Sequence, residues 1–332
     1  MMEWGPRKPP RLTAMHCRVA LTTIAMPPGP LKESCVSGIT VVGSINLDLL
    51  FPCERIPRPG ETLPAHSRQL APGGKGANQA TAAARLGAPV TMVGAVGDDE
   101  FSAAALALLD GAGVDLSHLL RTEGTTGIAV VYVEDAGENS ILIEAGANGR
   151  MDADRVAAAS APIADADIVV LQGEIPASGT EAAAALTNGR VILNLAPVLP
   201  LDADTIKKSD PLVVNEHEGT LALQLLGFAA DNDEAVVQAL LDAGVTSVVM
   251  TRGSQGALVG DASGIQSVAA VPVDVVDTTG AGDAFTGALA TRLLLGEPLV
   301  EAAAFAVRVA SFACTGRGAQ PSYPWAGDPL PS

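Results

Sequence analysis

Short runs of Val, Ile and Leu alternate with longer Ala-rich stretches along most of the chain, and this pattern limits the possible folds more than any other feature. Beyond Met151 the apolar runs at 168–171, 191–194, 212–214 and 245–251 have the length of strands, and the stretches between them have the composition of helices. Strands that alternate with helices pair into a parallel sheet with both faces covered. We therefore expect an α/β fold with helices on both sides of a mostly parallel central sheet.

The composition of the chain agrees with this class. Its 332 residues are 48% hydrophobic but only 3% aromatic, which suits helices packed on a Val-rich sheet better than a β-sandwich. The same signals predict helices at 77–86, 101–109, 281–294 and 299–312, and further strands at 39–45 and 90–96.

Two regions of the N-terminal half depart from the alternation. Residues 49–70 contain short segments interrupted by Pro, and residues 120–145 contain two strand-like runs joined by the turn residues Asp135–Gly137. We expect both regions to form a small β-sheet that serves as a lid. The predicted organisation is a disordered N-terminal extension over 1–38, one α/β domain over 39–326 and a C-terminal tail over 327–332.

Charge and residue usage exclude several classes of protein. The net charge of −17 would repel a phosphate backbone, so nucleic-acid binding is not expected. No apolar run reaches the roughly 18 residues of a membrane span. The histidines lack metal-binding spacing and the cysteines show no CxxC pattern, which favours a reducing cytoplasm over a disulfide framework or zinc site. The four cysteines are Cys17, Cys35, Cys53 and Cys314.

The segment DTTGAGDAF, at residues 277–285, carries the strongest chemical signal. A strand-like run passes through Gly280 into a helix, whose first N–H groups can bind an anion because small residues let it approach the backbone. Asp283 lies in the first turn, where its carboxylate can accept a proton from an attacking hydroxyl. Taken alone, such an Asp can also be a simple helix cap.

A second Gly-rich segment, APGGKGANQA, precedes the predicted helix at 77–86. Its glycines permit close approach to a polyhydroxylated ligand, while Lys75 and Asn78 offer hydrogen-bond donors. A plain Gly-rich turn is the alternative. The segment is not a phosphate-binding P-loop, because Lys75 is followed by Gly76 and Ala77 rather than by Ser or Thr.

Together the two segments resemble the ribokinase family of carbohydrate kinases, also called the PfkB family, from about residue 39 to 325. The resemblance implies a three-layer α/β/α fold with a β-sheet lid, and transfer of phosphate from ATP to a sugar. Within the family, the segments SINLD, GGKGAN, EAGAN and GRGAQPSYPW are similar to members that act on ribose rather than on fructose or adenosine. D-ribose is therefore the expected substrate and ribose 5-phosphate the expected product.

The resemblance also implies roles for individual residues. Asp283 would be the catalytic base, with the amides of Gly280, Ala281 and Gly282 as an anion hole. The sugar would contact Asn46, Asp48, Gly74, Lys75, Gly76, Ala77, Asn78, Glu174 and Asp283. ATP would contact Asn215, Glu218, Thr251, Arg252, Gly253, Ser254, Gln255, Gly256, Gly282 and Val307.

Two cofactors follow from the resemblance. Magnesium would enter with ATP, near Asn215 and Glu218. A monovalent cation, expected to be potassium, would be held mainly by backbone oxygens, since a Gly-rich loop with one carboxylate suits a large, weakly hydrated ion. Its ligands would be Asp277, Thr279, Ala313, Gly316, Gly318 and Ser322.

Three rival functions remain open from the sequence. A related kinase could act on deoxyribose, another pentose or hexose, or a nucleoside with the same machinery. A non-catalytic sugar-binding protein could use the same fold. A Rossmann dehydrogenase is the weakest rival, because no GxGxxG follows the first strand. For the kinase we expect a homodimer in which the lids of two copies pair.

Overall fold

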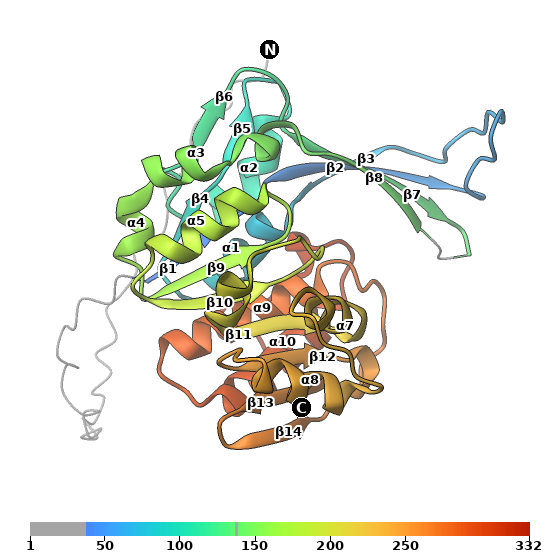
Figure 1. The fold of residues 1–332 in the computed structure, drawn as a ribbon. Coiled ribbons are helices and arrows are strands. Elements are labelled where there is room, and N and C mark those ends of the chain that lie inside the picture. Colours follow the sequence, from blue (N-terminus) through green and yellow to red (C-terminus); the bar gives the residue numbers. More distant parts are fainter. Residues whose placement is uncertain (1–37, 137–138) are drawn as a thin grey trace, which may run out of the picture. The chain divides into compact units, whose positions relative to one another are not determined.

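A mostly parallel sheet of eight strands forms the centre of the fold (Figure 1). The computed structural model describes residues 38–136 and 139–332. The pairs from β4 to β12 are parallel, while β12–β13 and β13–β14 are antiparallel. In spatial order the strands are β14 (Gly264–Val268), β13 (Ala257–Asp261), β12 (Val248–Thr251), β11 (Ser209–Asn215), β10 (Arg190–Asn194), β9 (Ile168–Gln172), β1 (Ile39–Val42) and β4 (Val90–Val93).

Helices cover both faces of this sheet, so the expected α/β/α class is confirmed. One apolar cluster contains residues of four helices: α1 (Lys75–Arg85), α2 (Ser102–Gly111), α9 (Ala281–Leu294) and α10 (Leu299–Ala313). The other contains residues of six: α3 (Ala153–Ala158), α4 (Ser160–Ala164), α5 (Ala177–Leu186), α6 (Ala203–Lys207), α7 (Glu216–Leu225) and α8 (Asp233–Asp242).

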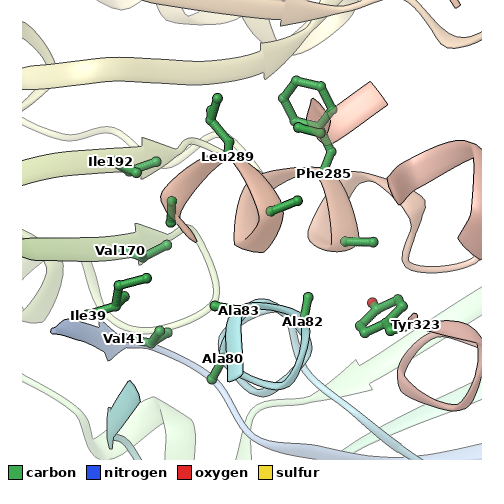
Figure 2. Close-up of a cluster of buried hydrophobic side chains, with 14 of the residues drawn as sticks. Ile39, Val41, Ala80, Ala82, Ala83, Val170, Ile192, Phe285, Leu289 and Tyr323 are labelled. Atoms are coloured by element: carbon green, nitrogen blue, oxygen red, sulfur yellow. The ribbon is translucent and has the colours of Figure 1, made fainter. Parts of the chain in front are cut away.

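Alternation along the strands explains why both clusters form. Successive side chains of a strand point to opposite faces. In β9, Val170 belongs to the cluster with α1 and α9, whereas Val169 and Leu171 belong to the opposite cluster. Figure 2 shows the first cluster, in which strand residues face α9 and the small residues of α1. The labelled side chains include Ile39, Val41, Val170, Ile192, Phe285, Leu289, Ala80, Ala82 and Ala83.

A second, four-stranded sheet is built from the two regions predicted as a lid (Figure 1). Its order is β3 (Gln69–Gly73), β2 (Asn46–Cys53), β7 (Gly127–Glu134) and β8 (Asn139–Glu144). A two-stranded sheet of β5 (Ala95–Gly97) and β6 (Leu120–Thr122) lies apart from it. The predicted turn Asp135–Gly137 lies partly outside the described residues.

The path after β1 differs from the sequence prediction. A single strand was expected to run over 39–45, with Asn46 and Asp48 at its end. In the structure β1 stops at Val42, and Asn46 begins β2 of the second sheet. The reason is that β2 pairs with β7 over its whole length and with β3 over Asn46–Leu50, so these polar residues gain strand partners outside the central sheet.

The N-terminal extension predicted over 1–38 lies almost wholly outside the described residues. Residues at the C-terminus lie against α10, because the Arg308 guanidinium donates to the carbonyls of Pro331 at 2.7 Å and Leu330 at 3.3 Å. None of the helices in the described ranges is long and apolar enough to cross a membrane.

Candidate active site

Two hollows in the described part of the chain share two lining residues, Thr251 and Gly282. The smaller has a volume of about 160 Å³ and the larger about 570 Å³. The smaller, here called the polar hollow, is lined by Lys75, Asn194, Ala196, Val213, Val214, Asn215, Glu218, Thr251, Gly280, Gly282 and Asp283. The larger, here called the apolar hollow, has walls that include Val271, Val273, Val275, Phe285, Val307, Ala310, Ser311 and Cys314.

The start of α9 lies where the two hollows meet. Gly280 has φ 73°, and a Cβ there would collide with Ala319 and the Tyr323 hydroxyl, so glycine is required. The Tyr323 hydroxyl donates to the carbonyl of Gly280 at 2.9 Å and braces this turn. Beside Gly282, by contrast, an added Cβ would meet open space. The helix therefore presents its N-terminus to both hollows.

The amides of this turn are only partly available for an anion. The Ala281 N–H donates to the carbonyl of Thr278 at 3.2 Å, so one of the three predicted donors is already engaged in a turn. The N–H groups of Gly280 and Gly282 have no such partner in the described residues. The N-terminal end of α9 thus keeps two predicted donors and its dipole for a negatively charged group.

Asp283 is 6% exposed, and both of its oxygens accept hydrogen bonds. Asn78 Nδ2 donates to Oδ2 at 2.9 Å, and Gln79 Nε2 donates to Oδ1 at 2.9 Å. The two donors are adjacent residues in the first turns of α1. The structure therefore brings the early and late Gly-rich segments together, although about 200 residues separate them.

The predicted sugar-binding turn at Gly74–Asn78 is held by a carboxylate. Glu174 Oε2 accepts from the Lys75 amide at 2.9 Å and from the Ser44 hydroxyl at 2.5 Å. A negative charge at the first amide of α1 stabilises the start of that helix. One oxygen of Glu174 thus anchors the turn. Glycine is required at position 74, because its φ is 86° and because a Cβ would press on the backbone around Ile45.

Asn46 and Asp48 occupy alternate positions of β2, so their side chains share one face. Asn46 Oδ1 accepts from Asn148 Nδ2 at 2.7 Å, and Asn148 Oδ1 accepts from the amide of Ile45 at 2.9 Å. Asn46 is paired with Gly73 on β3 and with Gly127 on β7. A Cβ at Gly73 would collide with the Asp48 carboxylate, and one at Gly127 would collide with Asn46 and Asn148.

The charges of Glu174 and Asp283 act on Asp48, and these three residues are here called the acidic cluster. Burial, followed by the charges of Glu174 and Asp283, raises the pKa of Asp48 to about 7. The charge of Asp283 raises the pKa of Lys75 against the effect of burial, and Glu174 and Glu218 contribute to this increase. The cluster has three carboxylates and Lys75 as the nearby cation. Ionised carboxylates are strong hydrogen-bond acceptors for neutral hydroxyl groups.

Asn215 and Glu218 form a capping box at the start of α7 and also line the polar hollow. The Asn215 amide donates to Glu218 Oε2 at 2.9 Å, and the Glu218 amide donates to Asn215 Oδ1 at 2.8 Å. Glu218 Oε1 has no hydrogen bond in the described ranges, so it can serve a water or a metal-bound water in the hollow.

Most of the predicted nucleotide segment at 251–256 lies along the apolar hollow. Thr251, Gly253, Ser254 and Gly256 line it, together with Val307 from α10. Arg252 and Gln255 line neither hollow, and the Arg252 guanidinium instead donates to the Ser267 hydroxyl at 3.2 Å. A contact between Arg252 and phosphate therefore stays a prediction without geometric support.

The segments predicted to hold a monovalent cation also meet. Asp277 Oδ1 accepts from the Thr279 amide at 2.9 Å, and Oδ2 accepts from the Gly318 amide at 2.8 Å. Burial opposes ionisation, but a hydrogen bond from the Thr279 hydroxyl, the two amide bonds and the charge of Arg317 together outweigh it and lower the pKa of Asp277. At Gly316 a Cβ would crowd Ser322. A charged carboxylate beside a loop rich in backbone carbonyls fits a large monovalent cation.

Several residues that shape the site were not assigned from the sequence. They are buried amides: Gln79, Asn148, Gln172, Asn194 and Gln320. A signal existed for Gln172 and Asn194, which end two buried strands at the carboxyl edge where ligands bind in open α/β sheets. Gln79 lies in the segment APGGKGANQA, but a Gln in a helix does not by itself indicate a role in a site.

The chain is similar to known proteins in both sequence and fold. The sequence profile of the pfkB family carbohydrate kinases matches residues 37–326. A ribokinase of Schizosaccharomyces pombe is 38% identical over 300 residues, covering 86% of this chain and 94% of the relative. A deoxyribokinase of Salmonella typhi is 35% identical over 291 residues, covering 86% and 95%. The structure of Arabidopsis thaliana ribokinase complexed with ribose and ATP superposes with a TM-score of 0.76 at 34% identity, covering 87% and 96%.

Proposed function

The chain belongs to the pfkB family of carbohydrate kinases, and we propose that it transfers the γ-phosphoryl group of ATP to the primary hydroxyl of D-ribose. The similar ribokinases support the choice of sugar. The observation that carries the proposal is the position of Asp283, which lies on α9 where the polar and apolar hollows meet at Gly282.

The apolar hollow suits the adenine base of ATP. Its walls combine Val271, Val273 and Val307 with the short side chains of α10, so a flat apolar group can be buried there. A nucleotide seated in this way would direct its phosphates across Gly282 toward the N-terminus of α9. The helix dipole and the amides of Gly280 and Gly282 would then stabilise negative charge on the transferred group.

The acidic cluster would bind the sugar. Asp48 accepts hydroxyl hydrogens, Asn78 and Lys75 donate, and Asn148 holds Asn46 in place. In the reaction, Asp283 takes the proton of the primary hydroxyl while the hydroxyl oxygen of the sugar bonds to the γ-phosphorus. The bond from that phosphorus to the ADP oxygen breaks at the same time. The lid sheet would close over the sugar and exclude water.

Two metal ions fit residues of the site. Asn215 and Glu218 would hold Mg²⁺ through water, since Glu218 Oε1 faces no protein donor in the described ranges. Asp277, with carbonyls of the loop at 313–322, would hold K⁺. When bound, Mg²⁺ neutralises phosphate oxygens, and K⁺ adds a positive charge beside the anion-binding turn.

We also propose that two copies pair through their lid sheets. The support is the exposed apolar side chains of the lid strands, Leu70, Ile141, Leu142 and Ile143, which are 47% to 69% exposed. Light scattering of the purified protein would then give the mass of two chains, and the mass of one chain would contradict the pairing.

A panel of sugars tests the proposed substrate. ADP release would be measured with ribose, deoxyribose, fructose and adenosine, each with and without potassium. We expect the highest kcat/KM with ribose and a lower rate without potassium. Ribose that binds without ADP formation would point instead to a sugar-binding protein.

Deoxyribose is the second candidate substrate, because the Salmonella typhi relative is a deoxyribokinase at nearly the same identity as the ribokinases. The two sugars differ by one hydroxyl, and a site that hydrogen-bonds this group rejects the sugar that lacks it. A higher kcat/KM with deoxyribose than with ribose would therefore reassign the substrate.

A further inference from the structure

A chain of buried side-chain amides leads from two strand ends of the central sheet to Asp283. Its members are Gln172 at the end of β9, Asn194 at the end of β10 and Gln79 on α1, and they are 1%, 8% and 0% exposed. Gln79 joins the others, since its Oε1 accepts from Gln172 Nε2 at 2.8 Å and its Nε2 donates to Asn194 Oδ1 at 2.9 Å. The same Nε2 reaches Asp283 Oδ1 at 2.9 Å.

The orientation of the Gln79 amide follows from its neighbours. Asn194 Nδ2 donates to the carbonyl of Val213 at 3.1 Å, and a carbonyl can only accept. Asn194 must therefore turn its oxygen toward Gln79. The ionised carboxylate of Asp283 is also only an acceptor, so Gln79 has to present its NH₂ group to both. The network has a single consistent arrangement, and that arrangement points a donor at Asp283.

Helix packing fixes the distance between Gln79 and Asp283. At Gly287, one turn beyond Asp283 on α9, a Cβ would press on the carbonyl of Gln79 and on Ala82. The missing side chain lets the backbones of α1 and α9 approach at this point. Gln79 thus reaches Asp283 from a rigid helix rather than from a loop, as precise positioning requires.

We propose that Gln79 is a positioning residue, which holds Oδ1 of Asp283 and thereby reserves Oδ2 for the proton of the sugar hydroxyl. This inference rests on the proposed kinase reaction. Oδ2 already accepts from Asn78, and a carboxylate oxygen has room for a second partner. A donor on Oδ1 suits both the carboxylate and the acid formed during turnover, so the network need not rearrange.

The charged groups around Asp283 act equally with or without Gln79. They are Lys75 on α1, Asp48 on β2 and Glu174 after β9, and the Tyr323 hydroxyl also feels the charge of Asp283. A change confined to Gln79 leaves all of these in place. A Gln79 variant also loses its hydrogen bonds to Gln172 and Asn194, but of the three bonds only the one to Oδ1 contacts Asp283, so a change in the pH profile reports that bond.

The test is Gln79→Met, which keeps the length of the side chain but removes its polar atoms. Assays would use whichever sugar the wild type phosphorylates, so an error in the substrate assignment would appear in the wild type first. We expect kcat to fall about tenfold to hundredfold, with KM for sugar and ATP within about threefold. The acidic limb of the kcat profile should move to higher pH, because a carboxylate that loses a donor binds a proton more readily.

Two further variants separate positioning from folding. Gln172→Met leaves the donor to Asp283 but frees the Gln79 amide, and should lower kcat by a smaller factor with the same direction of pH shift. It also serves if Gln79→Met does not fold. Thr291→Val, which removes a buried hydroxyl bonded to Gly287 on α9, should leave kcat and the pH profile unchanged. An unchanged pH profile in both Gln variants, with only a lower melting temperature, would overturn the proposal.

Discussion

The polar hollow and the apolar hollow meet at Gly282 but are built in opposite ways. Around the polar hollow, buried side chains of α1, two strand ends and α9 are hydrogen-bonded to one another, and Asn46 of the lid is held separately by Asn148. The apolar hollow is lined mainly by apolar side chains such as Val271, Val307 and Phe285, and Ser311 bonds within its wall, to the carbonyl of Val271 at 3.1 Å.

This difference separates two ways of recognising a ligand. A site made of fixed polar side chains discriminates through individual hydrogen bonds, and losing one leaves a buried partner unsatisfied. A site made of apolar walls recognises shape, so a side chain that fills its volume weakens binding, whereas a hydroxyl of equal size is tolerated where it finds a hydrogen-bond acceptor. We therefore expect isosteric substitutions to be costly on the first side and mild on the second.

Among these substitutions, Asp283→Asn should cause the largest loss of activity, seen as a fall in kcat. Replacing one carboxylate oxygen by NH₂ removes the proton acceptor and turns a donor toward Asn78 or Gln79, both of which already donate. We expect kcat to fall by about 10² to 10⁴, the range of general-base catalysis. ADP release at saturating ATP and ribose measures it. Near wild-type turnover would contradict the role of Asp283, and an unchanged affinity for ATP is the control.

Asp48→Asn probes the acidic cluster. An ionised acceptor holds a hydroxyl more strongly than an amide oxygen does, so KM for ribose should rise about tenfold to hundredfold at pH 8. Because the pKa of Asp48 is about 7, the wild type should lose this advantage as pH falls below 7. The two KM values should then converge. A constant ratio of KM values between pH 5.5 and 8 would contradict the raised pKa.

The same variant gives a stability test with a defined sign. The pKa of Asp48 rises from an ordinary 3.8 to about 7 on folding, so between these values the folded protein binds more protons than the unfolded chain. The free energy of unfolding of the wild type, relative to Asp48→Asn, should decrease as pH rises from about 4 to about 7 and stay constant above. Denaturant titrations at several pH values measure it.

The fold could largely be read from the sequence because buried parallel strands are continuous apolar runs. Helix α9 begins and ends at the predicted residues, 281 and 294. The antiparallel pair β13 and β14 was missed, since β14 (Gly264–Val268) is mostly exposed and lacks an apolar run. The order of the strands was also out of reach, because it depends on contacts between segments far apart in the chain.

The site was predictable only as separate pieces. The Gly-rich segments identified Asn78 and Asp283, but nothing local indicates that residues 205 positions apart share a hydrogen bond. The same holds for Gln320, which donates to Asn78 Oδ1 at 3.0 Å across 242 positions. Such amides look like ordinary surface residues until tertiary packing buries them and pairs most of their polar atoms, although Gln172 Oε1 is buried without a partner among the described residues.

The smallest effects are expected in the apolar hollow, where two substitutions on α10 form a matched pair. Ala310→Phe adds a phenyl ring to the wall and should raise KM for ATP about tenfold by occupying volume. Val307→Thr keeps the volume and adds one hydroxyl. It should change KM for ATP by less than about threefold, because the hydroxyl can bond to the preceding turn of its own helix.

The pair tests the contrast between the two hollows directly. KM for ribose should be unaffected in both variants, since neither residue lines the polar hollow. If shape determines binding in the apolar hollow, Ala310→Phe must raise KM for ATP more than Val307→Thr does. The opposite order would mean that a polar contact near Val307 matters for the nucleotide, and the two hollows would then recognise their ligands by the same means.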